Sequence, residues 1–366
     1  MRVAIACGGT GGHLFPGLAV AEALRRRGHE ALLLVSEKEI DRTALEGRGE
    51  FASRALPAVG WPGLGPRLPG FFLKLWRSAS ACRRLFQDYA PDAVLSMGGF
   101  TGAAPLWIAG RRKIPAFLHE SNAVPGRVTR LFARRVDRVL VGFGACAAAL
   151  SPARCSVTGT PVRGALREVP RAEAASALGL DPSRRTLLVA GGSQGARALN
   201  RLVCRTLPLW KDRLAAWQFI HLSGAADAEE TARAYQDIEA LAHVRPFSAQ
   251  MAEIYSLADL AVGRSGASTL TELAHYGLPS LLVPLPTAAE DHQTANARIF
   301  TQAGAASLFR QEDLTPQAFD AAVRGVLGEE HRLQEMARAA RALAVPDAAG
   351  RVAEAVLNGI QKGELR

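Results

Sequence analysis

The sequence predicts an α/β protein made of two Rossmann-like, doubly wound domains that face a cleft. Short apolar runs alternate with segments of helical periodicity, which is the pattern of βαβ units around a parallel sheet. The alternation restarts after a breaker-rich region at 158–173. The length of 366 residues also fits two domains of ordinary size, at about 150 residues each.

Apolar runs predict the strands, and 3.6-residue periodicity between them predicts the helices. In the first half, strands are expected at 3–7, 31–35, 93–97, 115–119 and 138–143, with helices at 16–28 and 126–136. In the second half, strands are expected at 186–190, 217–223, 260–262 and 281–284, with helices at 195–210, 228–242, 267–276 and in the tail from about 315, which Pro346 interrupts. We divide the chain into a first domain at 1–163 and a second at 164–366, whose final helix can pack back on the first.

The composition is that of a soluble globular protein. Hydrophobic residues make up 48% of the chain and charged residues 21%, which excludes wholesale disorder. The chain has no apolar run near the roughly 18 residues of a membrane-spanning helix. Its start, MRVAIACGGTGG, lacks the parts of a signal peptide, so we expect the protein inside the cell. The five cysteines form no C-x-x-C pair, which favours buried thiols over disulfides or zinc.

The positive charge is concentrated in the first half. Residues 1–163 hold 23 Lys and Arg against 11 Asp and Glu, a net charge of +12, whereas 164–366 hold 21 and 23, a net charge of −2. Arg outnumbers Lys by 39 to 5, which a GC-rich genome would explain, but such a bias does not explain the asymmetry. We therefore expect an anionic partner for the first domain, with nucleic acid, anionic lipid and phosphorylated metabolites all open.

Three glycine-rich loops each follow a predicted strand and open a predicted helix: GGTGGH (8–13), MGGFTG (97–102) and GGSQGA (191–196). Backbone N–H groups at a positive helix end can hold a phosphate. A single such loop is as often a plain tight turn, but three in one chain favour phosphate binding. The loops match neither the G-x-G-x-x-G dinucleotide fingerprint nor the P-loop, which ends in G-K-[ST].

Polar residues follow several of these strands and are candidates for chemistry. His13 closes the first loop at a helix start, where it would be a general base or a phosphate donor, or alternatively a helix cap. His119, Glu120, Ser121 and Asn122 follow a strand directly, so some of them are expected to bind ligand and the others to cap the next helix. Arg163 lies at the domain junction, where a guanidinium suits a diphosphate.

The second half contains two further candidate segments. RSGASTLTE (264–272) gives an anion-binding helix start, and its Glu272 suits the two hydroxyls of a ribose, with a solvated or capping glutamate as the alternative. EDHQTANA (290–297) offers His292 and Gln293 as hydrogen-bonding partners for a sugar. The sequence has no D-x-D pair and no H-E-x-x-H, so no metal site is predicted.

The segment at 61–77, WPGLGPRLPGFFLKLWR, combines apolar and basic residues. Such a segment is typical of one lying at an anionic membrane surface, and a core helix with basic ends is the alternative. The positive charge of the first half favours a membrane-surface segment over a core helix. The expected membrane contacts are Phe71, Phe72, Lys74, Leu75, Trp76 and Arg77, with Arg67 alongside.

Taken in order, GGTGGH, MGGFTG, HESNAVPG, GTPVR, GGSQGAR, RSGASTLTE and DHQTANA resemble the motifs of the MurG family of peptidoglycan glycosyltransferases, and the resemblance runs from end to end. It implies a GT-B fold and an inverting transfer with no metal and no cofactor. The donor would be UDP-GlcNAc and the acceptor the MurNAc C4 hydroxyl of undecaprenyl-pyrophosphoryl-MurNAc-pentapeptide (lipid I), giving lipid II.

The resemblance also divides the work between the domains. It implies a first domain, 1–163, that binds the acceptor and an anionic membrane, and a second domain, 164–366, that binds UDP-GlcNAc. The enzyme would be a peripheral protein on the cytoplasmic face of the inner membrane, with other cell-wall synthesis proteins as further partners and no nucleic acid.

Residue roles carry over to matching positions. Asn122 would contact the sugar, Glu272 the ribose hydroxyls and Gln293 the GlcNAc. The donor sugar and diphosphate would be bordered by Thr10, Gly11, Gly12, Arg163 and Ser193, and the diphosphate and ribose lined by Ala267, Ser268, Thr269, Leu270 and Thr271. The backbone near Ser248 would bind the uracil.

Two positions depart from the family pattern. Ser248 stands where Ile is frequent, and His292 where some members have Gln, which puts side-chain packing on uracil and sugar selectivity through residue 292 in question. We expect His13 to be the base, with Glu120 as the alternative.

Three other functions stay open. A UDP-GlcNAc 2-epimerase would share the fold and the donor but would have no use for a membrane surface. A dinucleotide oxidoreductase would use Glu37, which follows the second strand, for its ribose. A nucleic-acid-binding module is disfavoured because the basic region does not interleave aromatic residues in an RNA-binding pattern.

Overall fold

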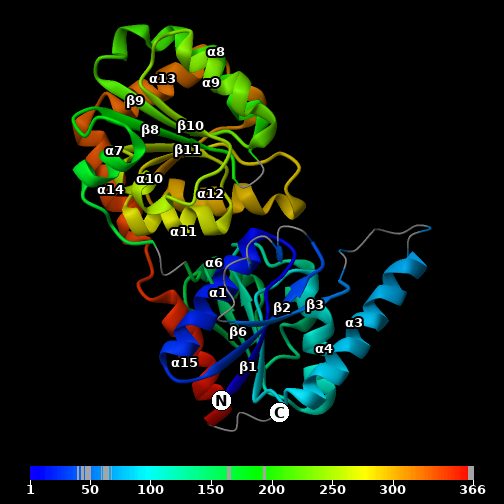
Figure 1. The fold of residues 1–366 in the computed structure, drawn as a ribbon. Helices are drawn as coiled ribbons and strands as arrows, with labels where there is room; N and C mark the ends of the chain where they lie inside the picture. The colour runs from blue at the N-terminus through cyan, green and yellow to red at the C-terminus, as the bar shows by residue number, and fades with distance from the viewer. Residues whose placement is uncertain are drawn as a thin grey trace. The chain divides into compact units, whose positions relative to one another are not determined.

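A computed structural model describes residues 1–38, 41–42, 45, 51–58, 60, 66, 68–162, 166–192 and 195–361. The chain divides into two compact units, Met1–Gly164 with Val345–Arg366, and Ala165–Ala344. Each unit is built around one sheet whose strand pairs are all parallel, with helices packed against it (Figure 1). The predicted α/β class with two parallel-sheet domains is therefore confirmed.

The sheet of the first unit has the order β3-β2-β1-β4-β5-β6-β7. Its strands are β1 Arg2–Ala6, β2 Glu30–Ser36, β3 Ala52–Leu56, β4 Ala93–Ser96, β5 Ala116–Glu120, β6 Arg138–Val141 and β7 Cys155–Val157. The helices described in this unit are α1 Gly11–Arg26, α3 Leu68–Asp88, α4 Ala103–Arg112, α5 Arg127–Phe132, α6 Gly144–Ala149 and α15 Ala348–Gln361, with the 3₁₀ turn η1 at Phe100–Gly102.

The side chains of β1 alternate between two hydrophobic cores, as the period of a strand requires. Val3 and Ile5 pack in the core that also contains residues of α1 and α15. Ala4 and Ala6 pack in the core formed with α3 and α4 on the opposite face. Figure 1 shows α15, in red, lying beside α1, so the end of the chain belongs to the first unit.

The sheet of the second unit has the order β10-β9-β8-β11-β12-β13. Its strands are β8 Arg185–Ala190, β9 Trp217–Leu222, β10 Ala242–Arg245, β11 Leu260–Gly263, β12 Ser280–Leu282 and β13 Ala306–Leu308. Its α-helices are α7 Arg171–Leu178, α8 Arg197–Thr206, α9 Ala228–Gln236, α10 Met251–Leu257, α11 Ala267–Tyr276, α12 His292–Gln302, α13 Pro316–Leu327 and α14 Glu330–Ala342. The helix expected to run from 195 to 210 ends at Thr206, and the 3₁₀ segment η2 Leu207–Arg213 follows it.

The core of the second unit contains a neutral histidine. His221 is fully buried on β9, and its ring lies 3.1 Å from Tyr235 Oη and 3.1 Å from Asn200 Oδ1. Burial lowers the pKa of His221 from 6.5 to about 3, because a charged imidazole would lose its hydration.

This histidine predicts a loss of stability in acid. Below pH 6.5 the unfolded chain binds a proton at residue 221 that the folded chain does not bind until about pH 3. The free energy of unfolding should therefore decrease as the pH is lowered from 6.5 to about 3, by on the order of 1 kcal/mol per pH unit from this group. Urea denaturation at several pH values should give a shallower slope for His221→Gln than for the parent chain. Equal slopes would contradict the prediction.

Candidate active site

The first glycine loop places His13 in the opening turn of α1. The helix begins at Gly11, so Gly12 and His13 are helical, and Thr10 is the N-cap with extended backbone. Thr10 Oγ1 and His13 Nδ1 are hydrogen-bonded at 2.9 Å, which fixes the rotation of the half-buried imidazole ring. The first turn contains no acidic residue that would repel an anion from this helix end.

The second glycine loop packs against His13. A Cβ atom added at Gly99 would lie 2.9 Å from His13 Cε1, and the φ of Gly99 is +69°, so only glycine suits this position. Thr101 Oγ1 donates to Gly8 O at 2.7 Å. The loops at 8–13 and 97–102 meet because they follow β1 and β4, which are neighbours in the sheet.

A buried carboxylate and a lysine hold the first loop from the side of β2. Asp41 Oδ2 accepts hydrogen bonds from Gly9 N and Ser36 N, both at 2.8 Å, and Asp41 is fully buried. Lys38 Nζ donates to Gly9 O at 3.1 Å and lies 5.1 Å from the centre of the Phe100 ring. Sequence analysis missed both residues, since neither belongs to a glycine motif.

Glu120 holds the loop that presents Asn122. Its Oε1 accepts from the backbone N and the side-chain Nδ2 of Asn122, each at 3.1 Å. Its Oε2 accepts from Gly126 N at 3.0 Å and Thr129 Oγ1 at 2.6 Å, at the start of α5. Only 5% of Glu120 is exposed, so the carboxylate is built into the loop.

His119, the other titratable residue of this segment, faces the interior. It is fully buried, and its Nε2 lies 2.9 Å from Gly159 O, so that nitrogen carries the proton. Burial lowers the pKa of His119, which keeps the ring neutral. Ser121 is buried as well, with Oγ 3.5 Å from His119 Nδ1.

In the second unit, the segment 264–272 forms the start of α11, as the motif predicted. Gly266 is the N-cap, without a side-chain cap, and the first turn has no acidic residue. Leu270 is fully buried and Ala267 is 6% exposed, so these two can meet a ligand only through backbone atoms. Ser268, Thr269 and Thr271 are half-buried, and Thr271 Oγ1 donates to Ala267 O at 2.9 Å.

A buried arginine lies beneath this helix start. Arg264 is 9% exposed, and its Nη1 donates to Val283 O at 2.9 Å and Pro284 O at 3.0 Å. Its Nη2 donates to Gln311 Oε1 at 2.7 Å. The guanidinium thus fixes the segment after β12 against the loop that opens α11.

Glu272 is oriented by an aromatic partner that sequence analysis missed. The hydroxyl of Tyr255, on α10, donates to Glu272 Oε2 at 2.8 Å. Tyr255 is 5% exposed and Glu272 is half-buried, so the carboxylate is held by a rigid neighbour. A fixed carboxylate of this kind suits the paired hydroxyls of a ribose.

His292 and Gln293 lie in the first turn of α12. His292 Nδ1 donates to Ala289 O at 2.7 Å. Gln293 Oε1 accepts from Leu285 N at 2.9 Å, and Gln293 O accepts from Ser265 Oγ at 2.8 Å, which ties α12 to the start of α11. Because its carbonyl oxygen is used, Gln293 would present N–H donors to a ligand.

Ser248 is 7% exposed, and its Oγ accepts from Gln250 N at 3.0 Å just before α10. The side chain is thus occupied by the local turn, which leaves the backbone as the group able to meet a base. Arg163 and Ser193, both expected at the diphosphate, and Arg67, expected beside the membrane segment, lie outside the described residues.

The expected membrane segment forms the first half of α3. Phe72, Leu73 and Trp76 are 56%, 49% and 65% exposed. Phe71 is half-buried and contacts Phe72 in an edge-to-face arrangement, with ring centres 5.5 Å apart. Leu75 differs from expectation: it is half-buried and packs against the core, because it shares a helix face with the buried Ala79, Cys82 and Phe86. The exposed position belongs instead to Leu73.

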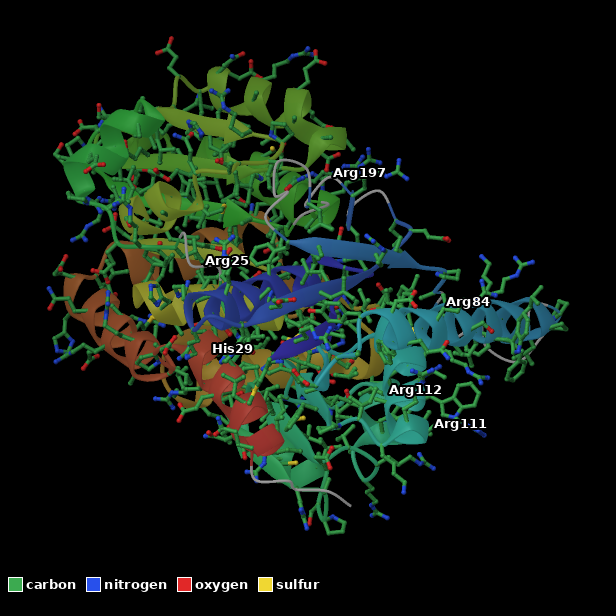
Figure 2. All side chains as sticks on the ribbon, turned by 60° about the horizontal axis from the view of Figure 1, so that its bottom comes forward. Arg25, His29, Arg84, Arg111, Arg112 and Arg197 are labelled. Atoms are coloured by element: carbon green, nitrogen blue, oxygen red, sulfur yellow. The ribbon has the colours of Figure 1, made fainter. Side chains whose placement is uncertain are left out.

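Helix α4 extends this surface. It packs beside α3, and Trp107 is 44% exposed, with the Arg111 guanidinium 5.3 Å from its ring centre. Figure 2 shows Arg84 of α3 and Arg111 and Arg112 of α4 on the same side of this unit. We call α3 and α4 with their exposed aromatic and basic side chains the α3–α4 surface. In the described part of the chain, no helix is both long and apolar enough to cross a bilayer.

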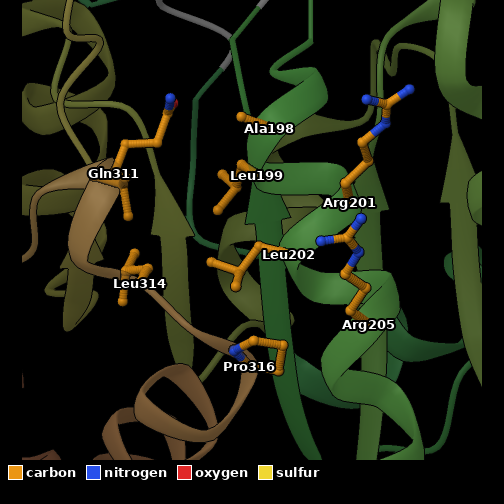
Figure 3. A pocket seen from close by; sticks show the side chains of 9 residues that line it. Ala198, Leu199, Arg201, Leu202, Arg205, Gln311, Leu314 and Pro316 are labelled. Atoms are coloured by element: carbon orange, nitrogen blue, oxygen red, sulfur yellow. The ribbon is translucent and has the colours of Figure 1, made fainter.

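A cavity of about 330 Å³ beside α8 is lined by Arg201, Arg205, Gln311 and neighbouring apolar residues, and it contains none of the predicted site residues (Figure 3). Within the described residues, no group of three or more His, Cys, Asp or Glu side chains is arranged to hold a metal ion.

The chain matches two family models in sequence. Residues 3–141 match the glycosyltransferase family 28 N-terminal domain, and residues 186–352 match the glycosyltransferase family 28 C-terminal domain. These two ranges contain the glycine loops and the start of α11 described above.

Curated relatives match over almost their whole length. The chain is 40% identical to the UDP-N-acetylglucosamine--N-acetylmuramyl-(pentapeptide) pyrophosphoryl-undecaprenol N-acetylglucosamine transferase of Methylococcus capsulatus, over 97% of this chain and 98% of that one. It is 39% identical to the enzyme of the same name from Rippkaea orientalis, over 98% of this chain and 99% of the relative.

Solved structures agree with the sequence comparisons. The crystal structure of Acinetobacter baumannii MurG superposes with a TM-score of 0.77 at 30% identity, over 98% of this chain and 99% of that one. The calicheamicin glycosyltransferase CalG4 superposes with a TM-score of 0.67 at 15% identity, over 98% of both chains, and shows the shared fold alone. The chain therefore belongs to the MurG family of N-acetylglucosamine transferases, within glycosyltransferase family 28.

Proposed function

We propose that the protein transfers GlcNAc from UDP-GlcNAc to the MurNAc C4 hydroxyl of undecaprenyl-pyrophosphoryl-MurNAc-pentapeptide, with inversion at the anomeric carbon. The observation that carries this proposal is the full-length similarity, at 36–40% identity, to proteins that bear the transferase name. The same similarity favours transfer over the epimerase alternative.

The second unit supplies the donor-binding groups. Glu272, held by Tyr255, accepts hydrogen bonds from the ribose hydroxyls, and Gln293 donates to the GlcNAc. The uncapped start of α11 meets the diphosphate, since helix N–H groups stabilise an anion without desolvating a separate cation. These groups stabilise the UDP that leaves when the bond from C1 to the diphosphate oxygen breaks.

The first unit supplies the base. As the acceptor hydroxyl attacks C1 from the face opposite UDP, its proton passes to His13. Thr10 Oγ1 orients the ring of His13, and the glycines at 98 and 99 leave room for it. Glu120, the other candidate, already accepts four hydrogen bonds from residues 122–129, which supports a scaffolding role for it.

The α3–α4 surface supports peripheral binding to the membrane that contains the lipid acceptor. Exposed aromatic side chains insert into the interface and basic side chains attract anionic head groups. This arrangement would place the protein on the cytoplasmic leaflet, where a soluble nucleotide sugar and a lipid-linked acceptor are both accessible.

Transfer of label from UDP-[14C]GlcNAc to a lipid I analogue tests the proposal. We expect labelled lipid whose formation requires both substrates and persists in excess EDTA, because the sequence offers no D-x-D pair for a metal. Conversion of UDP-GlcNAc to UDP-N-acetylmannosamine in the absence of acceptor would favour an epimerase. Loss of transfer in EDTA, restored by Mg²⁺, would contradict the metal-independent step.

Replacing Glu272 by alanine should weaken UDP-GlcNAc binding by roughly 1–3 kcal/mol, because the ribose hydroxyls and Tyr255 lose their acceptor. Tyr255→Phe should weaken binding less, since the carboxylate stays but loses its orienting hydroxyl. Titration calorimetry measures both, with the exposed Glu229→Ala as the matched control. Unchanged affinity in Glu272→Ala would remove this residue from the site.

A further inference from the structure

Five side chains of the second unit form one hydrogen-bonded chain, which we call the Arg197 network. Arg197 Nε lies 3.0 Å from Asp227 Oδ1, and Asn200 Nδ2 lies 2.8 Å from Asp227 Oδ2. Asn200 Oδ1 is 3.1 Å from His221 Nε2, and His221 Nδ1 is 3.1 Å from Tyr235 Oη. The network runs from Tyr235 on α9 through His221 on β9 to Arg197, the first residue of α8.

The proton positions along this network follow from the two acceptors that surround Asn200 Nδ2. Asn200 Nδ2 faces two acceptors, Asp227 Oδ2 and Ser223 O, the latter also at 2.8 Å, so it must be the amide nitrogen. Asn200 Oδ1 is then an acceptor, and His221 Nε2 must donate to it. His221 Nδ1 is left to accept from the Tyr235 hydroxyl. Every member has a partner of the right kind, so the network has one arrangement.

The network is buried at its base and exposed at its tip. Asn200, His221 and Tyr235 are 2%, 0% and 1% exposed, whereas the side chain of Arg197 is 62% exposed. Although burial opposes ionisation, hydrogen bonds from Arg197 and Asn200 lower the pKa of Asp227. The carboxylate therefore stays charged, and a rigid anchor holds an exposed guanidinium.

The same anchor lies against Gly195, near the end of the third glycine motif. Gly195 has a φ of +74°, and a Cβ there would collide with Ser223 O, the carbonyl that Asn200 Nδ2 binds. Arg197 follows this loop directly, and Figure 2 shows its side chain at the surface. Arg197 uses Nε for Asp227, so the four N–H groups on Nη1 and Nη2 are those it can offer to another group.

Two arginines of α8 lie near Asp227. Arg201, one turn further along α8, also lies within electrostatic range of Asp227, so two guanidinium groups share one carboxylate. Like charges on one helix face repel, and an anion near them relieves that repulsion. The exposed guanidinium of Arg197 and the start of α8 beside it thus favour the same ligand chemistry, an anion.

We propose that Arg197 binds the diphosphate of the donor nucleotide, and that Asp227 and Asn200 are positioning residues that aim its guanidinium. This inference rests on the function proposed above. Arg197 would neutralise the charge that develops on UDP as the C1–oxygen bond breaks, through a planar donor pair that suits phosphate oxygens.

Binding of UDP and of uridine to full-length variants tests this assignment. Arg197→Gln should weaken UDP binding about 10- to 100-fold, the equivalent of one charged hydrogen bond, and leave uridine inhibition of transfer unchanged. Arg197→Lys should recover only part of the loss, because it keeps the charge but not the fork. Arg233→Gln, at another exposed, ion-paired arginine of this unit, should bind UDP like the parent chain.

A double-mutant cycle tests the positioning role. Asp227→Asn should lower UDP affinity less than Arg197→Gln does, and the double variant should bind no more weakly than Arg197→Gln alone. Additive losses would show that Asp227 acts without Arg197 and would overturn the positioning role, whatever the melting temperature of the Asp227 variant.

The outcomes separate this inference from the proposed function. A parent chain that binds no UDP and transfers no GlcNAc would refute the function itself. The assignment of Arg197 alone would be refuted if the parent chain does both and Arg197→Gln binds UDP as tightly as the parent chain. It would also be refuted if Arg197→Gln weakens uridine binding as much as it weakens UDP binding.

Discussion

Replacing His13 by alanine is expected to lower the turnover of GlcNAc transfer about 10²- to 10⁴-fold, the range typical of a removed general base. The affinity for UDP-GlcNAc should change little, since Glu272, Gln293 and the start of α11, which we propose as its main binding groups, belong to the second unit. The physical reason is that the acceptor hydroxyl is a poor nucleophile until its proton has a place to go. Initial rates at saturating donor and acceptor measure the effect, and calorimetry with UDP measures the donor affinity.

Several variants separate a base from a structural histidine. His13→Gln keeps a hydrogen-bonding group next to Thr10 but cannot take a proton at neutral pH, so it should be as slow as alanine. Thr10→Val should lose less, because the imidazole stays but its ring is no longer fixed. His29→Ala changes a histidine just beyond the other end of α1 and serves as the matched control (Figure 2).

The pH profile gives an independent test. A base active in its neutral form makes turnover fall as pH drops below its pKa, and this acidic limb should be absent in His13→Ala. A loss smaller than tenfold, with the acidic limb retained, would make His13 a structural residue. Glu120→Gln would then be the next variant, with a thermal melt beside it because the Glu120 carboxylate holds residues 122–129.

The central strands could be predicted from the sequence, and the edge strands could not. β1, β2, β4, β5 and β6 are continuous apolar runs because both faces of an inner parallel strand are covered. The four strands without a prediction are β3, β7, β10 and β13, and they are the outermost strands of the two sheets. Their sequences ASRAL, CSV, AHVR and ASL are partly exposed, so no apolar run marks them.

The motifs predicted the loops of the candidate site but not the residues that hold them. Asp41 and Lys38 reach Gly9 only because β2 lies beside β1, and Tyr255 reaches Glu272 from a different helix. Contacts of this kind depend on sheet order and helix packing, which no local pattern contains. The packing of Leu75 against the core was missed for a related reason: the helical phase of α3 is set by Ala79, Cys82 and Phe86, beyond the segment considered.

Replacing Phe72, Leu73 and Trp76 together by serine is expected to abolish cosedimentation with vesicles containing anionic lipid. These side chains are the exposed apolar part of α3, so their loss removes the insertion that salt does not screen. UDP affinity and melting temperature should stay close to those of the parent chain, because none of the three side chains is buried. Phe247→Ser, at an equally exposed aromatic of the second unit, is the matched control and should leave vesicle binding intact.

The basic residues of the α3–α4 surface should contribute the part of binding that salt weakens. Each charge is worth about 1 kcal/mol at an anionic surface, so Lys74→Gln with Arg77→Gln should weaken vesicle binding at low salt and have little effect at high salt. Leu75→Ser should do the opposite: it should lower the melting temperature, because this side chain packs against the core, while the folded fraction still binds vesicles. A folded triple variant that still sediments with vesicles would show that α3 faces something other than the membrane.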